Sequence, residues 1–148
     1  MGGREMLAKR HAALKKLTST TISVGVHKDA GQYDNGMKVS DVAVINHFGS
    51  LDGRIPSRPF MTIAQKESHS AVSSKMKEAA RAAAKGNDGV AIFKLAGQEL
   101  EKSAKGVIDS ISALTPNAPS TIAKKGKNHP MHDTGRMRNY ITTKERSD

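Results

Sequence analysis

The chain has 148 residues, a formal net charge of +10 and no cysteine. Its length suits one domain with a core of its own, and the lack of cysteine excludes disulfides and thiolate metal sites. Aromatic residues make up 3% of the chain and tryptophan is absent, so the core must be built from aliphatic side chains. We therefore expect a single domain over residues 1–148, of modest stability that assembly with neighbours would raise.

The positive charge is unevenly distributed along the chain. Residues 1–17 carry +4, residues 61–87 carry +3 and residues 114–148 carry +4, whereas residues 18–60 are neutral and residues 88–113 carry −1. No aromatic side chains are interleaved with the basic ones, as a base-stacking surface would require. A basic nucleic-acid-binding or architectural protein is therefore an alternative that rests on charge alone.

No stretch has the pattern of a secreted or membrane-inserted protein. The first 17 residues are basic but lack the uninterrupted apolar run of a signal peptide. No window approaches the roughly 18 apolar residues that a membrane-spanning helix requires. We expect the protein to be soluble and intracellular when it is made, and to have no membrane partner.

The chain begins with a helical pattern and continues with an extended one. Apolar residues recur at spacings of three and four over residues 4–17, which predicts an amphipathic helix. Apolar and polar residues then alternate over residues 20–26, which predicts a half-buried strand. The glycine, asparagine and aspartate residues of 29–36 predict a loop after this strand.

A short helix and a rigid extended segment are expected next. Residues 42–48 have a helical pattern, with Ser40 and Asp41 as its cap and Gly49 as the glycine that ends it. In the segment IPSRPF at 55–60, each proline fixes its own φ and restricts the preceding residue to extended geometry. We expect this segment to cross the domain and to position the helix that follows.

Two long helices and a second strand make up the remainder of the predicted fold. Helical periodicity extends over residues 60–85 and 88–114, and the alanines near the end of the first helix would allow close packing. Pro116 ends the second helix. Residues 137–143 are predicted to form a strand, and residues 142–148 are predicted to be a polar tail.

The predicted fold class is α+β. A small antiparallel sheet is packed against the two long helices and the N-terminal helix, and a long basic loop precedes the C-terminal strand. Two strands alone do not form a stable sheet. Either further strands lie within residues 27–40 or neighbouring subunits complete the sheet, and the second alternative predicts an oligomer.

The longest segment without a helix or strand pattern is the loop predicted over residues 116–135. It is rich in proline, glycine and asparagine, and it contains Lys124, Lys125 and Lys127. Loops longer than about 12–15 residues are uncommon in compact domains unless they are functional or disordered. We therefore expect this loop to reach a partner.

The predicted loop ends in a turn made by Asp133, Thr134 and Gly135. Aspartate and threonine side chains close turns onto backbone N–H groups, and glycine can take positive φ. The turn would direct the chain into the last strand, with Arg136 and Arg138 on one face. It is either simply a well-formed turn or an anchor that lets the basic part of the loop lie on another subunit.

No combination of residues predicts catalysis, a metal site or a cofactor. Ser57, Thr134, His47 and Asp133 could be arranged as a hydrolase site, but the G-x-S-x-G motif is absent, so a Ser/His hydrolase is a remote alternative. The six histidines offer no second pair at metal-ligand spacing, and the glycines form no phosphate-binding loop. We expect no enzyme activity, no metal ion, no cofactor and no small-molecule substrate.

Six short motifs follow one another over residues 22–141. In order they are VGV at 24–26, VAVINHFG at 42–49, IPSRPF at 55–60, TP at 115–116, KG at 125–126 and PMHDTGRMRNYI at 130–141. Together they resemble a pattern of the neck and tail-completion family of long-tailed bacteriophages, small proteins that join the DNA-filled head to the tail. The departures are mild, since His47 stands in place of an acidic residue and Met131 and Met137 stand in place of leucines.

The resemblance implies a structural virion protein that forms a homo-oligomeric ring and completes the tail or neck. Its implied location is the neck or tail top of the virion, and the host cytoplasm during assembly. The implied partners are further copies of the chain and neighbouring head–tail connector, tail terminator or tail tube proteins, with DNA in the lumen as a further candidate contact. We expect these residues at subunit or partner interfaces: Arg58, Phe60, Lys124, Lys125, Lys127, Asp133, Thr134, Arg136 and Arg138.

Overall fold

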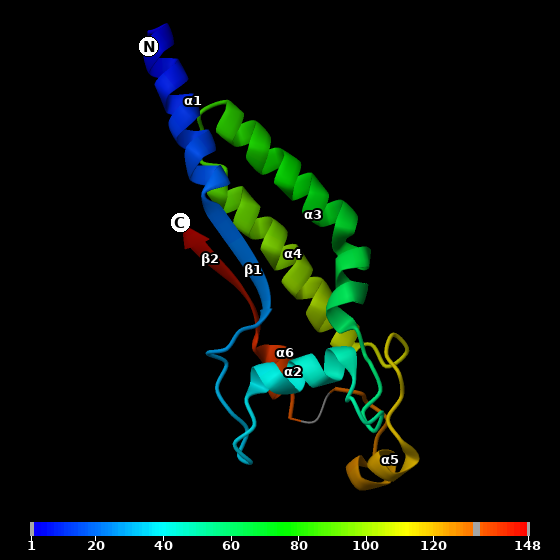
Figure 1. Cartoon of the computed structure of the whole chain (residues 1–148). Helices are drawn as coiled ribbons and strands as arrows, with labels where there is room; N and C mark the ends of the chain where they lie inside the picture. The colour runs from blue at the N-terminus through cyan, green and yellow to red at the C-terminus, as the bar shows by residue number, and fades with distance from the viewer. Residues whose placement is uncertain (1, 132–133, 148) are drawn as a thin grey trace. The chain divides into compact units, whose positions relative to one another are not determined.

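The computed structural model describes residues 2–131 and 134–147 (Figure 1). Its elements are α1 (Gly3–Thr18), β1 (Thr20–Val26), α2 (Val39–Phe48), α3 (Phe60–Ala84), α4 (Val90–Asp109), α5 (Pro119–Lys125), α6 (Arg136–Asn139) and β2 (Ile141–Ser147). The two strands form an antiparallel sheet, and the long helices α3 and α4 pack together. The predicted α+β class, with its small sheet, two long helices and N-terminal helix, is confirmed.

The chain is divided by its internal contacts into two compact units, each assembled from several segments. Unit 1 contains the described residues of 1–24, 68–100 and 143–148, and unit 2 contains those of 25–67 and 101–142. The division does not follow the element boundaries, because α3, α4 and both strands contribute residues to each unit.

Unit 1 depends on close approach between small residues. Ala79 of α3 is 1% exposed and lies against Gly89, where a Cβ atom would collide with the carbonyl oxygen of Ala79. Gly97 of α4 lies against the sheet, since a Cβ there would come within 2.6 Å of Ile22 Cγ2 and 2.7 Å of Thr143 Cγ2. The prediction that the alanines of α3 allow close packing is therefore confirmed.

Unit 2 has an aliphatic core to which α2, α6 and parts of α3 and α4 contribute. Its buried apolar residues are Ala30, Val39, Ala43, Phe60, Ala64, Ala104, Val107, Ile108, Leu114, Met137 and Ile141. Among the described residues, Phe60 is the one buried aromatic side chain in this list. Because the sequence has few aromatic residues, this core is built mainly from aliphatic side chains.

The extended segment 55–60 lies directly against the end of α2. Gly49 ends this helix with φ of 84°, and a Cβ there would come within 2.9 Å of the carbonyl oxygen of Ile55. The Ser57 hydroxyl donates a hydrogen bond of 2.8 Å to the carbonyl oxygen of His47. The glycine that was expected to end the helix therefore also makes room for the crossing segment.

The long segment before the last strand differs from its prediction. The sequence pattern predicts a loop throughout residues 116–135, whereas the structure contains α5 at Pro119–Lys125. Pro119 lies in the first turn, where its missing N–H is not needed, and Gly126 takes φ of 69° after the last turn. The prediction of a continuous loop is wrong because these two helix-boundary signals were read as loop residues.

The C-terminal strand is displaced from its predicted position. Residues 137–143 are predicted as a strand, but the structure has α6 at Arg136–Asn139 and begins β2 at Ile141. The helical turn follows Gly135, which takes φ of 75° at its N-cap, and it buries Met137 to 3% exposure ahead of the fully buried Ile141 of β2. The strand continues through most of the expected polar tail, because ladder hydrogen bonds use backbone groups and charged side chains suit an exposed edge.

Two helix boundaries also differ from the predictions. The helix α2 starts at Val39, so Ser40 and Asp41 lie inside its first turn and do not cap it. The helix α4 spans Val90–Asp109 rather than 88–114, and the Asp88 carboxylate accepts a hydrogen bond of 3.0 Å from the backbone N–H of Val90. Between the two strands, the described residues of 27–40 contain an isolated bridge, Gln32 to Lys38, and no third strand.

We predict that alanine has opposite effects at two glycines of α4. Gly97→Ala should lower the free energy of unfolding by about 1–3 kcal/mol, because its methyl group would displace Ile22 and Thr143. Gly106→Ala is the matched control, since nothing lies within 4 Å of its added Cβ, and it should raise the free energy by about 0.5–1 kcal/mol. Urea denaturation of both variants checks this, and equal stabilisation by both would contradict the close approach of α4 to the sheet.

Candidate functional site

Arg58 joins the crossing segment to the start of the long C-terminal segment. Its side chain is buried, and Nε donates a hydrogen bond of 2.9 Å to the carbonyl oxygen of Thr115. One terminal nitrogen donates to the carbonyl oxygen of Pro116 at 3.2 Å and to Oδ1 of Asn117 at 3.3 Å. The backbone N–H of Arg58 donates to the carbonyl oxygen of Asn46 at 2.8 Å. A single residue therefore fixes three segments of unit 2 to one another.

The guanidinium of Arg58 is buried without a carboxylate partner among the described residues. The Arg58 residue is 6% exposed, and burial lowers the pKa of its guanidinium from the ordinary value of an arginine. The cause of this shift is desolvation, which disfavours the charged form. Beside it, Nδ2 of Asn117 is also buried and has no hydrogen-bond partner among the described residues. Both groups favour an anion or a carbonyl oxygen as a further neighbour.

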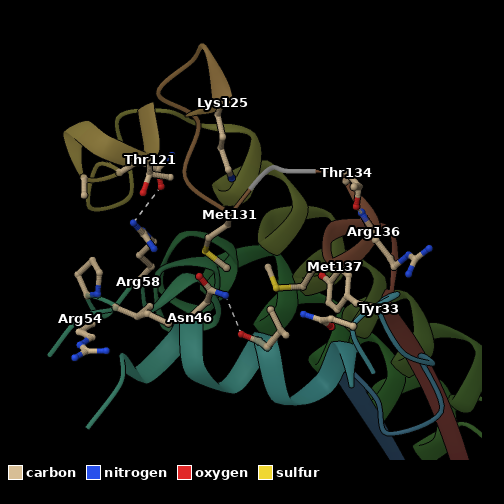
Figure 2. A pocket seen from close by; sticks show the side chains of 17 residues that line it. Tyr33, Asn46, Arg54, Arg58, Thr121, Lys125, Met131, Thr134, Arg136 and Met137 are labelled. Carbon is tan, nitrogen blue, oxygen red and sulfur yellow. Dashed lines mark hydrogen bonds between the residues drawn. The ribbon is translucent and has the colours of Figure 1, made fainter. Parts of the chain in front are cut away.

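Arg58 forms one side of a cavity in unit 2, which we call the basic hollow. The hollow has a volume of about 390 Å³, and its basic residues are Arg54, Arg58, Lys125 and Arg136. Figure 2 shows Arg58 on one side of it, Arg136 on the other and Lys125 extending toward Met131 from α5. No aspartate or glutamate is among the described residues that line it. Cations converge here from the crossing segment, α5 and α6.

The arginines around the basic hollow differ in how firmly they are held. Arg136 donates a hydrogen bond of 2.9 Å to the carbonyl oxygen of Gln32, lies 3.8 Å from the Asp34 carboxylate and stacks 5.5 Å from the ring centre of Tyr33. Arg54 is paired with an aspartate at 3.3 Å, but its side chain is 86% exposed. Arg136 is thus held by contacts with residues 32–34, whereas the guanidinium of Arg54 is exposed.

The structure brings four of the expected interface residues together at the basic hollow. These are Arg58, Lys125, Thr134 and Arg136. The Thr134 hydroxyl accepts a hydrogen bond of 3.3 Å from the backbone N–H of Arg136, and Gly135 takes φ of 75°, so the parts of the expected turn made by Thr134 and Gly135 are present.

The other expected interface residues lie elsewhere. Lys124 and Lys127 are exposed, whereas Phe60 is 2% exposed and belongs to the core of unit 2. Arg138 forms two hydrogen bonds of 2.6 Å with the carboxylate of Asp109, which raise its pKa. These contacts make Arg138 a bridge between α6 and α4. Asp133 lies outside the described residues.

Sequence reasoning did not single out several residues that line the basic hollow. They are Tyr33, Asn46, Arg54, Asn117 and Thr121. Arg54 immediately precedes the IPSRPF motif and Asn46 lies within VAVINHFG, so both belong to or adjoin motifs already noticed. Tyr33 and Thr121 carry no local signal, because only the folded chain brings them beside Arg58.

Ser57 and His47 do not form a nucleophile–base pair in the structure. The Ser57 hydroxyl donates to the backbone carbonyl oxygen of His47, and the imidazole Nε2 lies 3.4 Å from Thr62 Oγ1. The imidazole ring packs edge-on against Phe48 and Phe60, with centres 4.6 and 5.4 Å away. The histidine is thus placed for packing, and its Nδ1 is buried without a partner among the described residues.

Comparison with protein-family models, curated proteins and solved structures finds no match to this chain. Of the described helices, none is both long and apolar enough to cross a membrane. In the same residues, histidine and carboxylate side chains form no group of three or more suited to a metal ion.

We predict that Arg58 cannot be replaced by lysine without loss of stability. Lysine keeps the charge but lacks the planar set of donors that reaches two carbonyl oxygens and an amide. Arg58→Lys should lower the free energy of unfolding by about 1–3 kcal/mol, the usual effect of leaving buried polar groups unpaired. Arg54→Lys is the matched control and should change it by less than about 0.5 kcal/mol, because Arg54 is exposed. Equal urea midpoints for the two variants would contradict the structural role of Arg58.

We predict that His47 makes the protein less stable in mild acid. Burial lowers the pKa of His47 in the folded state, so the unfolded chain binds its proton first as the pH falls. Stability should therefore be lost as the pH falls below about 6.5, the unfolded value, until the lower folded pKa is reached. His47→Gln should lose less stability than the parent protein between about pH 7.5 and pH 5, measured by urea denaturation. An identical loss in both would assign the effect to other groups.

Proposed function

We propose that this chain is a structural virion protein of a tailed bacteriophage, which completes the neck or tail as a ring of identical subunits and joins head to tail. The order of its six motifs supports this proposal, since they resemble those of neck and tail-completion proteins. The observation that carries it in the structure is the basic hollow. Four residues expected at an interface line one cavity, and Arg58 is far from the other three in the sequence.

The chemistry of the basic hollow suits an acidic protein segment. Arginine and lysine side chains pair well with carboxylates, and arginine can do so with two parallel hydrogen bonds. The volume of about 390 Å³ is enough for one or two side chains of a partner rather than a whole domain. We infer that an aspartate- or glutamate-bearing segment of a neighbouring subunit, or of a virion protein stacked on the ring, enters the hollow beside Arg58.

The helix α5 fits the role of a docking element. It has no buried residue, and its last turn carries Lys124 and Lys125. An exposed seven-residue helix is only marginally stable by itself, so contact with a partner would stabilise it. The helix α5 would then be fully formed only when it is bound to its partner in the assembled virion.

The net charge of +10 favours a second function, binding to nucleic acid. Such binding would weaken steeply with salt, because each neutralised phosphate releases counterions. Measuring the affinity of the purified chain for duplex DNA at several salt concentrations separates the two functions. Strong binding at physiological salt with no assembled rings would favour the nucleic-acid function.

We predict that one added carboxylate in the basic hollow blocks head–tail joining. Thr121→Glu would place a negative charge among the cations and repel an acidic partner, whereas Ala123→Glu adds the same charge at an exposed position of α5 that does not line the hollow. Each variant would replace the natural gene in the phage genome. Electron microscopy should show unjoined heads and tails for Thr121→Glu and normal particles for Ala123→Glu.

Removal of residues 118–128 is the stronger form of the same test. The purified subunit should stay folded, because α5 contributes no buried side chain, but particles should remain unjoined. Normal infectious particles from this deletion and from Thr121→Glu would reject the proposed role of the basic hollow.

A further inference from the structure

The N-terminal helix α1 presents an apolar face that the described chain leaves largely exposed at Leu7 and partly exposed at Leu14. None of its residues is buried, and Leu7 and Leu14 are 65% and 39% exposed. These leucines are seven residues apart, so they lie on one side of the helix. A 16-residue helix with no buried face is marginally stable in water. Covering this surface with another helix or groove would therefore stabilise α1.

The opposite side of α1 is the one that contacts the remainder of unit 1. A Cβ added to Gly86 would lie 3.2 Å from Cγ of Lys9, and the ammonium group of Lys16 pairs with the Asp88 carboxylate at 2.9 Å. Lys9 and Lys16 are themselves seven residues apart and mark one side of the helix. The leucine face is turned away from it. Arg4 and Arg10 border that face one turn from Leu7, so its polar margin is cationic.

Unit 2 presents a complementary surface on α2. Val44 and Phe48 are 55% and 74% exposed, whereas the other side of the helix is buried through Val39 and Ala43. A groove of about 270 Å³ runs beside these residues, and its lining includes Val26, His47, Phe60 and Met61. Exposed apolar residues that are contiguous in this way mark interaction sites more often than isolated ones do.

The charges of the two faces are of opposite sign. Asp41 precedes Val44 and Phe48 by three and seven residues, so it lies on the exposed face of α2. Asp41 forms no ion pair among the described residues, and neither do Arg4 and Arg10 of α1. The apolar face of α1 with its cationic margin thus matches the apolar face of α2 with its anionic margin, and every copy of the chain carries both faces.

We propose that α1 of one copy of the chain lies on the exposed face of α2 of a second copy. Leu7 and Leu14 cover Val44 and Phe48, and an arginine of α1 approaches Asp41. Because the two surfaces differ, the contact is heterologous, and repeating it generates a ring when the rotation closes. The inference rests on the proposed assembly of identical copies and names the surfaces through which neighbours join.

Single-cysteine variants test this contact directly, since the natural chain contains no cysteine. Purified Leu7→Cys and Val44→Cys proteins are mixed and treated with a bismaleimide whose span is about 8–10 Å, the distance between packed helices. Any link between residues 7 and 44 must then join two copies. We expect this link as the major product by mass spectrometry. Ala12→Cys replaces Leu7→Cys in the control mixture and should give little product, because it lies on the other side of α1.

A second measurement uses variants that keep the full chain. Leu7→Asp with Leu14→Asp should convert the assembled protein to a monomer in light scattering, and both positions are exposed, so folding should be unaffected. Met76→Asp, at a half-exposed apolar position of α3, is the matched control and should assemble normally.

The outcomes separate this inference from the proposed function. If the unaltered protein assembles but residues 7 and 44 are not linked and the double aspartate variant still assembles, the α1–α2 contact is wrong and the ring proposal stands. If the unaltered protein stays monomeric at every concentration and forms no link, both are wrong. A link from residue 44 only to a different protein in phage particles would also overturn the contact between copies.

Discussion

The hydrogen bonds of Arg58 are the interaction on which the candidate site depends. The backbone N–H of Arg58 fixes the crossing segment to Asn46 of α2, and its buried guanidinium fixes it to Thr115 and Pro116, which lie between α4 and α5. A buried cation without a carboxylate costs free energy, and natural proteins retain such groups where their donors are satisfied or where an anion binds. Here the carbonyl oxygens of Thr115 and Pro116 accept hydrogen bonds from the guanidinium, and the basic hollow beside it has space for a further acceptor.

The packing of unit 1 depends on small residues. Few large rings are available, so unit 1 relies on the close approach of Ala79, Gly89 and Gly97 to their neighbours. Cores of this kind bury limited apolar area and lose stability quickly when a methyl group is added or removed. Covering exposed apolar faces by assembly is a direct way to supplement such a core. The uncovered face of α1 and the two-stranded sheet are both consistent with a subunit built for that purpose.

Periodicity predicted the long helices and the first strand because each depends on a repeated local pattern. It failed after Pro116, where short elements follow boundary signals instead: Pro119 and Gly126 enclose α5, and Gly135 precedes α6. The candidate site was predicted only in part, because some of its residues come together only in the folded chain. Arg58 and Lys125 stand out in the sequence, but Tyr33 and Thr121 reach the basic hollow only through tertiary packing, which no local pattern encodes.

The mass of the purified, unaltered protein is the most direct test of the central claim that copies of this subunit must assemble. Native mass spectrometry across a range of protein concentrations would measure it without labels or variants. The account predicts one closed oligomer of fixed copy number, with no series of larger species, because a heterologous contact that closes leaves no free end. A monomer of 15.8 kDa at every concentration would contradict it.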